Sequence, residues 1–211
     1  MGWHDWKEKS DATSLLDTVT ALTFALDAKD HYTQSHSLNV SRFAAQIARQ
    51  LGLSGAEIEE VRLGGILHDI GKIGLPDNIL NKPSPLTPEE FEVVKSHAPL
   101  GARILKPLRA KAIEPIRGMV RHHHERVDGT GYPDGLKGEK IPLGARIIAV
   151  AEAFDVITSI SYRVYQQGRS VEEAVAELRR CSGMQFDPDI VDTFIRLLEG
   201  PGSPLPPREP G

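Results

Sequence analysis

Three helix-start signals recur along the chain and restrict what it can fold into. Each is a capping box, in which Ser or Thr is followed three residues later by Glu, so that two backbone N–H groups gain side-chain partners. They stand at 54–57, 87–90 and 170–173, and Pro88 adds the residue favoured in a first helical turn. Apolar residues recur at helical spacing, and no run alternates with the period of a strand. We therefore expect an all-α fold, a bundle of about eight helices without a sheet.

Helical periodicity also predicts where the elements lie. The stop signals include Gly52 and Gly71, each placed just after a periodic stretch. Helices are expected over residues 13–29, 40–51, 54–70, 98–106, 111–124, 142–159 and 187–198, and after Thr87 and Ser170. Two stretches rich in Gly and Pro, 71–88 and 125–142, should be loops, and a loop that long inside a compact domain is usually functional.

Length and composition suggest the domain organisation. We expect a lead or linker over residues 1–12, one domain over 13–200, and a disordered tail over 201–211, which holds five prolines in eleven residues. The 25 basic and 29 acidic residues give a net charge of −4, which argues against binding of a nucleic-acid polymer or an anionic membrane surface. Without a signal-peptide pattern or a membrane-length apolar run, we expect a soluble, cytoplasmic domain.

Cys181 is the only cysteine. It excludes an internal disulfide and a cysteine-based zinc site. Because it lies on an apolar-patterned stretch, we expect a buried thiol rather than a nucleophile.

Histidine is the unusual count, because seven of the eight histidines lie between His31 and His124. Imidazole is the commonest metal ligand in proteins and the side chain that titrates near neutral pH. The sequence therefore points toward a metal site.

One cluster of chemically active residues is His68, Asp69 and Lys72, where a predicted helix ends. Neighbouring helix residues point about 100° apart, so His68 and Asp69 can contact the same ion or two adjacent ions. A carboxylate can bridge two metals about 3.5–4 Å apart, and a lysine can place its ammonium beside a phosphate. The alternative is a histidine that merely stabilises a helix C-terminus beside an aspartate.

A second cluster ends another predicted helix, where three consecutive histidines, 122–124, lead into the long glycine loop. Three neighbours on a helix cannot all face a core, so a solvated run is the alternative to a ligand set. His36 and His97, on their own predicted helices, are further candidates, although a single histidine is more often structural. Taken together with His68 and Asp69, they form a mixed set that suits iron, manganese or zinc.

Two strings carry a family resemblance. Residues 67–74 read Leu-His-Asp-Ile-Gly-Lys-Ile-Gly, and residues 123–133 read His-His-Glu-Arg-Val-Asp-Gly-Thr-Gly-Tyr-Pro. At this spacing the chain resembles the HD-GYP family, a bacterial branch of the HD-domain metal phosphohydrolases, from about residue 28 to residue 198. The resemblance implies a helical bundle with two or three metals, usually iron or manganese. It also implies hydrolysis of cyclic di-GMP to linear pGpG and sometimes onward to GMP.

The resemblance also implies a role for each matching residue. One metal would be held by His36, His68 and Asp69, and Asp69 would bridge to a second metal. That second metal would be held by His97, His123 and His124, with His122 outside the ligand set. The residues implied in catalysis are Asp69 and Lys72, and those implied in substrate binding are Lys72, Gly131, Tyr132, Pro133 and Arg163. The Gly-Tyr-Pro loop would cover the site and contact protein partners of the GGDEF type, and a homodimer is a further expectation.

Some positions depart from the family pattern. Glu152 stands where the family has a metal-binding Asp, so its extra methylene either shifts the ligand geometry or removes the contact. Asp155 matches the family's second Asp, which is usually not a ligand. The segment ending at Arg163 lacks one basic residue of the family's substrate-binding stretch, and Asn39 replaces an Arg. Two alternatives to an active cyclic di-GMP phosphodiesterase therefore stay open: a catalytically weak regulatory module acting through the loop, and a hydrolase for another nucleotide.

The position four residues before His36 bears on the metal count. Family members with three metals have a glutamate there, but this chain has Tyr32. A neutral phenol with a pKa near 10 is a poor ligand for a hard divalent ion at pH 7. We therefore expect two metals per chain, iron or manganese by resemblance, with zinc or another divalent ion as the alternative.

Overall fold

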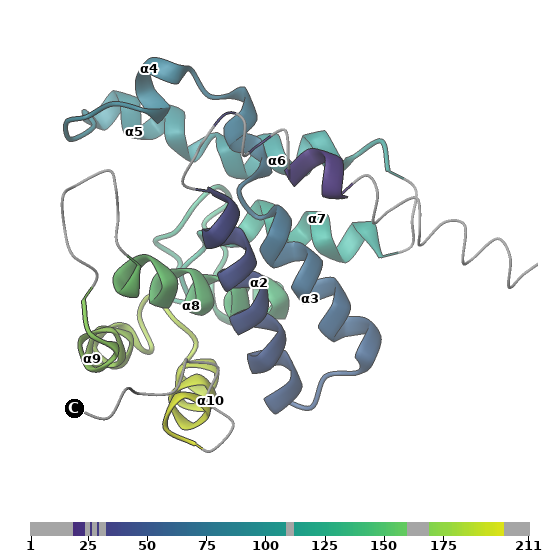
Figure 1. The fold of residues 1–211 in the computed structure, drawn as a ribbon, viewed down its shortest axis with the longest axis vertical. Helices are drawn as coiled ribbons and strands as arrows, with labels where there is room; N and C mark the ends of the chain where they lie inside the picture. The colour runs from purple at the N-terminus through teal and green to yellow at the C-terminus, as the bar shows by residue number, and fades with distance from the viewer. Residues whose placement is uncertain are drawn as a thin grey trace, which may run out of the picture.

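The computed structural model describes residues 19–23, 26, 29, 33–108, 112–159 and 169–200, and these form an all-helical bundle (Figure 1). The α-helices are α2 (Thr33–Gln50), α3 (Gly55–Leu67), α4 (Asp77–Leu80), α5 (Pro88–Lys95), α6 (His97–Leu105), α7 (Ile113–His122), α8 (Leu143–Thr158), α9 (Val171–Cys181) and α10 (Pro188–Glu199). Two 3₁₀ helices, η1 (Ile70–Gly74) and η2 (Gly138–Lys140), lie in the connections, and residues 19–23 are also helical. The described residues contain no strand, only one isolated bridge between Ser182 and Phe186. The expectation of an all-α fold is confirmed.

Local start and stop signals account for many of the helix ends. All three capping boxes form, with the Ser or Thr side chain accepting from the backbone N–H three residues on and the Glu accepting from the cap N–H. Gly52 adopts a φ of 78° after α2, a conformation that favours glycine. The expected loop over 71–88 is wrong in part, because η1 and α4 form within it. Pro76 supplies the extended residue from which α4 begins.

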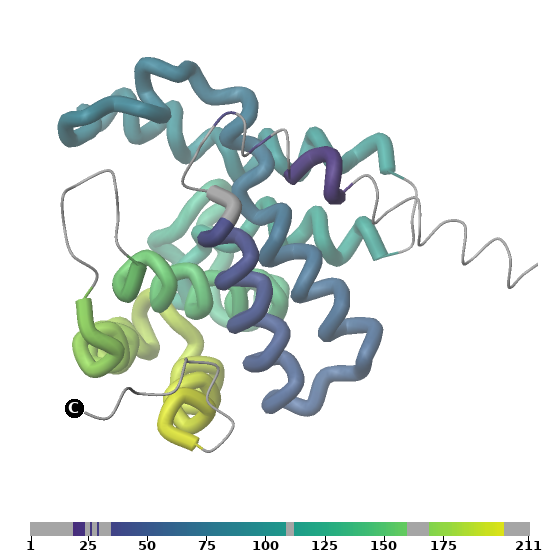
Figure 2. The backbone as a smooth tube through the Cα atoms, viewed as in Figure 1, coloured from purple at the N-terminus to yellow at the C-terminus, as the bar shows by residue number. Residues whose placement is uncertain are grey.

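Two apolar clusters hold the bundle together. The first lies between α2, α8, α9 and α10, where the rings of Phe43, Phe154 and Phe194 meet at centroid distances of 5.0–5.8 Å. The second lies between α3, η1, α6 and α7 and includes Leu67, Ile70 and Leu105. Figure 2 shows α2 and α3 side by side, and most of the buried apolar residues of α2 belong to the first cluster, whereas most of those of α3 belong to the second. Cys181 is buried in the first cluster, as expected.

Two glycines let neighbouring backbones approach closely. A Cβ on Gly65 of α3 would lie 2.8 Å from the Cα of Ser41 in α2. A Cβ on Gly71 of η1 would lie 1.9 Å from the backbone oxygen of His97 and 2.6 Å from the nitrogen of Gly101, both in α6. Glycine at position 65 therefore lets α2 approach α3 closely, and glycine at position 71 lets α6 approach η1 closely.

Among the described residues, no helix combines the length and the apolar composition that crossing a bilayer requires. The expected lead over 1–12, the tail over 201–211, Tyr32 and Arg163 lie outside the described residues.

Candidate metal centre

Four buried histidines come together from four different helices. His36 lies in the first turn of α2, His68 follows α3, His97 opens α6 and His123 follows α7. None of the four is more than 4% exposed. Burying polar rings is costly unless they are bound or hydrogen-bonded, so their convergence at one place calls for a partner.

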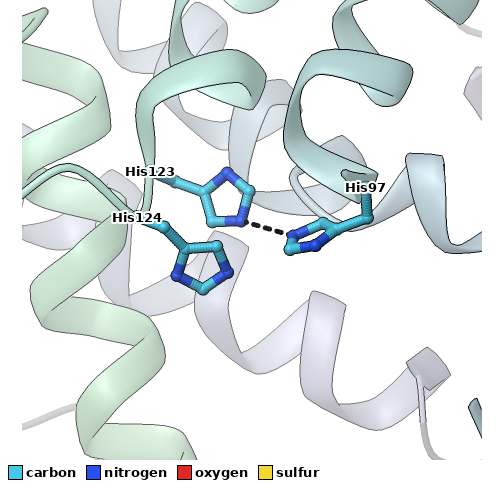
Figure 3. Close-up of side chains that lie close together, drawn as sticks. All are labelled: His97, His123 and His124. Carbon is cyan, nitrogen blue, oxygen red and sulfur yellow. Dashed lines mark hydrogen bonds between the residues drawn. The ribbon is translucent and has the colours of Figure 1, made fainter. Parts of the chain in front are cut away.

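The first cluster consists of His97, His123 and His124, each of which offers a ring nitrogen within 4.8 Å of the others (Figure 3). The Nε2 atoms of His97 and His123 lie only 3.2 Å apart. Their Nδ1 atoms lie 2.7 Å from the carbonyl oxygen of Val94 and 2.8 Å from that of Val120. With Nδ1–H donating to these carbonyls, both Nε2 atoms present lone pairs to each other. Two lone pairs at this distance repel each other unless a proton or a metal ion lies between them, so the arrangement suits a bound cation.

The second cluster consists of His36, His68 and Asp69, whose potential ligand atoms also lie within 4.8 Å of one another. His68 Nδ1 donates to the carbonyl of Gly65 at 2.8 Å, and its buried Nε2 has no hydrogen-bond partner among the described residues. His36 Nδ1 lies 2.7 Å from Oδ2 of buried Asp155. A carboxylate on the far nitrogen of a ligating histidine fixes the tautomer and orients the ring, as is usual around protein-bound metals.

Asp69, a member of the second cluster, also lies close to the first. Its Oδ1 is 3.4 Å from His97 Nε2, and its Oδ2 is 3.4 Å from His68 Nε2. Lys72 Nζ lies 2.5 Å from Oδ2. Although burial opposes ionisation, the neighbouring Lys72 and His68 charges hold the pKa of Asp69 well below its ordinary value. An ionised carboxylate with one oxygen toward each cluster has the arrangement of a bridging ligand.

The protonation states of His97 and His123 suit cation binding, whereas His68 would have to lose a proton. Burial, reinforced by nearby positive charge, lowers the pKa of His97 to about 4 and also lowers that of His123, so both are neutral at pH 7. Burial would also lower the pKa of His68, but the charges of Asp69 and Glu152 outweigh it and raise this pKa to about 9. Metal binding displaces such protons, because only a neutral imidazole coordinates. The donor set of imidazole nitrogens and one shared carboxylate therefore fits divalent metal ions.

The two acidic residues of α8 have different surroundings. Glu152 lines the cavity beside the clusters, and its charge favours protonation of His68 and His124. It belongs to neither cluster of described residues with ligand atoms within 4.8 Å. Asp155 instead contacts His36, a contact that the sequence did not predict. The signal available was the one-turn spacing of two acidic residues on an apolar helix.

The Gly-Tyr-Pro loop, residues 131–133, lies against the cluster of His97, His123 and His124. The ring of Tyr132 lies 4.8 Å from that of His124 with an interplanar angle of 31°, and the Tyr132 N–H donates to the His124 carbonyl at 3.3 Å. Burial, with the negative charges of Glu152 and Asp69, raises the pKa of Tyr132 above its ordinary value. Pro133 follows through a cis peptide bond. The loop thus covers part of the histidine cluster, where the sequence placed it.

A buried carboxylate holds this loop in shape. Glu125 accepts from the backbone N–H of Asp134 at 2.7 Å and from that of Leu136 at 3.0 Å. A Cβ on Gly131 would lie 2.4 Å from the backbone nitrogen of Arg126, so the loop can fold back on itself only with glycine there. These contacts keep the loop close to the cluster of His97, His123 and His124.

His122 lies apart from both clusters, in a group with Glu125 and Asp134. Its Nε2 is 2.9 Å from Asp134 Oδ2, and Arg121 binds the same carboxylate through two hydrogen bonds of 2.6 and 2.8 Å. Because Asp134 is already held by a guanidinium, this group is better described as an ion-pair network that joins α7 to the loop.

A cavity of about 630 Å³ opens beside the clusters. Such a volume is in the range of small-molecule sites. Its lining includes Phe91, Lys95, His124, Tyr132, Glu152 and Phe186. The structure therefore brings together all the predicted metal ligands except Glu152, which lies nearby. Lys72 and the Gly-Tyr-Pro loop are in the same region.

Comparison with known proteins agrees with a metal centre in a helical domain. A family model described as HD domain matches residues 20–190. A cyclic di-GMP phosphodiesterase of Thermotoga maritima is 39% identical over 87% of this chain and 49% of its own length. A cyclic di-GMP phosphodiesterase of Pseudomonas aeruginosa is 43% identical over 90% of this chain and 48% of its own length. The chain thus spans about half the length of these curated relatives.

Among solved structures, a cyclic GMP-AMP-specific phosphodiesterase of Vibrio cholerae superposes with a TM-score of 0.63 at 26% identity. The match covers 87% of this chain and 48% of the other. The fold described above is therefore shared with a phosphodiesterase of known structure.

Proposed function

Because this chain belongs to the HD domain family, in its HD-GYP branch, we propose that it is a metal-dependent phosphodiesterase that hydrolyses cyclic di-GMP to pGpG or onward to GMP. The observation that carries the proposal is the position of Asp69 between two histidine clusters, beside a cavity of about 630 Å³. This arrangement suits a two-metal phosphodiester hydrolysis, in which a carboxylate bridges the ions. The similarity to cyclic dinucleotide phosphodiesterases supports the choice of substrate.

We propose two divalent ions per chain, iron or manganese, with zinc as the alternative. His36, His68 and Asp69 would hold one ion, and Asp69 with His97, His123 and His124 would hold the other. When bound, the ions supply Lewis acidity toward the phosphoryl oxygens and an activated water.

The chain's own side chains support this chemistry in distinct ways. Asp155 holds the Nδ1 side of His36, which leaves Nε2 for a ligand role. Lys72 keeps its ammonium at Asp69, where it would stabilise negative charge on the phosphate. Tyr132 packs on His124 and restricts access of bulk water to that face of the cluster.

A second candidate function is a regulatory module with weak catalysis, which acts by docking through the Gly-Tyr-Pro loop. The position of Glu152 outside both clusters favours it, because the family has a metal-binding Asp there. GGDEF-type proteins docking on the loop, a homodimer, cytoplasmic location and a domain spanning 13–200 stay predictions, as do the roles of Gly131, Tyr132, Pro133 and Arg163 in substrate binding.

The test is turnover of cyclic di-GMP by protein reconstituted with iron or manganese, with pGpG and GMP separated chromatographically. Asp69→Ala should abolish turnover, because among the described residues no other carboxylate contacts both histidine clusters. Asp192→Ala removes an exposed carboxylate on α10 and serves as the matched control. Wild-type turnover in Asp69→Ala would refute the two-metal proposal. A wild-type protein that binds cyclic di-GMP and metal without turnover would favour the regulatory module.

A further inference from the structure

Helix α5 exposes apolar surface toward the cavity. None of its eight residues, all of which the structure describes, is buried. The side chain of Phe91 is 45% exposed although it is apolar, and it lines the same cavity as His123 and His124. An exposed aromatic ring in the wall of a small-molecule cavity contributes little to the core and is available to a ligand.

Phe91 is part of an aromatic chain that leads to the metal ligands. Its ring lies 6.4 Å from that of Tyr132 at an interplanar angle of 82°, and Tyr132 in turn packs on His124 at 4.8 Å. A planar ligand that stacked on Phe91 would therefore be separated from His124 by the rings of Phe91 and Tyr132.

A cation accompanies these rings. Lys95, one turn after Phe91 on α5, has its Nζ 5.2 Å from the Phe91 centroid and 5.6 Å from the Tyr132 centroid. Its ammonium also pairs with exposed Glu92 at 2.6 Å, an ion pair of the kind that is weak in water. The flexible lysine stem lets the ammonium move from the ring faces to the edge of a base stacked there.

We propose that Phe91, Tyr132 and Lys95 form a guanine-binding subsite, which holds one base of the cyclic dinucleotide while its phosphate lies at the metal clusters. This inference rests on the proposed function and goes beyond it by naming the residues that bind and select the guanine base. Aromatic side chains stack on any base. Lysine donates hydrogen bonds only, so it matches the O6 and N7 acceptors of guanine, whereas adenine presents a donor at the corresponding 6-position.

The stacking contact is tested with Phe91→Ala, Phe91→Trp and a matched control, Val93→Ala. Val93 is an apolar residue on the same helix, 36% exposed, and is not among the residues that line the cavity. Phe91→Ala should raise KM for cyclic di-GMP by about 5- to 100-fold with metal content retained, because loss of stacking removes binding that is common to ground state and transition state. Phe91→Trp should restore a KM near that of the wild type, and Val93→Ala should leave KM unchanged.

The selectivity of Lys95 is tested with Lys95→Met, which keeps the length of the side chain and removes its charge. The ratio of kcat/KM for cyclic di-GMP to that for cyclic di-AMP should fall about tenfold, the scale of one base-edge contact. An unchanged ratio would overturn the guanine assignment.

If wild-type protein turns over cyclic di-GMP but Phe91→Ala matches Val93→Ala, the subsite is overturned and the proposed function stands. If metal-loaded wild-type protein turns over no cyclic dinucleotide, the proposed function and the guanine-binding subsite are both overturned. A fall of metal content together with kcat in Phe91→Ala would show a structural role and would also overturn the subsite.

Discussion

Gly71→Ala is expected to separate the two halves of the metal centre. The added Cβ would lie 1.9 Å from the backbone oxygen of His97, where an ordinary contact needs at least 3.4 Å. Both partners are backbone, so no side-chain rotation relieves the clash, and η1 must move away from α6 by about 1.5 Å. Asp69 and His97, now 3.4 Å apart between Oδ1 and Nε2, lie on the two sides of that contact. A shift of this size would disrupt a carboxylate bridge between ions about 3.5–4 Å apart.

The expected cost is about 3 kcal/mol or more in the free energy of unfolding, at the upper end for overpacking of a core. Urea denaturation of the metal-free protein measures it without interference from ligand binding. Metal analysis of reconstituted protein should in addition show fewer ions per chain than in the wild type. Gly118→Ala in α7 is the matched control, because its Cβ would meet only Pro142 Cγ at 3.8 Å. It should stabilise the helix by about 0.5–1 kcal/mol. A Gly71→Ala protein that loses less than about 0.5 kcal/mol and binds full metal would refute the close-approach reasoning.

Three further predictions address single side chains. Asp155→Asn places an amide against His36 Nδ1 and should weaken metal binding about 10- to 100-fold in a competitive chelator titration; unchanged affinity would show that Asp155 does not orient His36. Lys72→Ala should retain the metals and lower turnover of cyclic di-GMP by about 100-fold, and a loss of metal instead would make Lys72 a structural part of the centre. Glu152→Asp, which restores the family residue, should raise turnover if the extra methylene displaces the carboxylate from the metals, and an equal or lower rate would show that the backbone has adapted to glutamate.

Features encoded locally could be predicted from the sequence. The capping boxes at Ser54, Thr87 and Ser170 all form, because each depends on residues three positions apart. The predicted helices over 54–70 and 111–124 place His68 and His123 in their last turns, whereas in the structure α3 and α7 end just before these histidines. The family resemblance then implies which residues share a metal ion, because the separate sequence motifs do not show which histidines lie close together in space.

Features that depend on distant residues could not be predicted. The contact between His36 and Asp155 joins residues 119 positions apart, and no local pattern reports it. The facing Nε2 atoms of His97 and His123 depend on how α6 packs against α7. The prediction that Gly71 ends a helix at residue 70 is wrong, because α3 ends at Leu67 and Gly71 lies within η1. The close contact of Gly71 with α6 could not be predicted, because a glycine near a helix end says nothing about the distant backbone it contacts.

The central claim is that two ions share Asp69. Anomalous diffraction from crystals of manganese-loaded protein tests it most directly, because it locates the ions independently of activity. We predict two peaks about 3.5–4 Å apart, one on each side of Asp69, with His36 and His68 near one peak and His97, His123 and His124 near the other. A single peak, or two peaks of which only one contacts Asp69, would contradict the account.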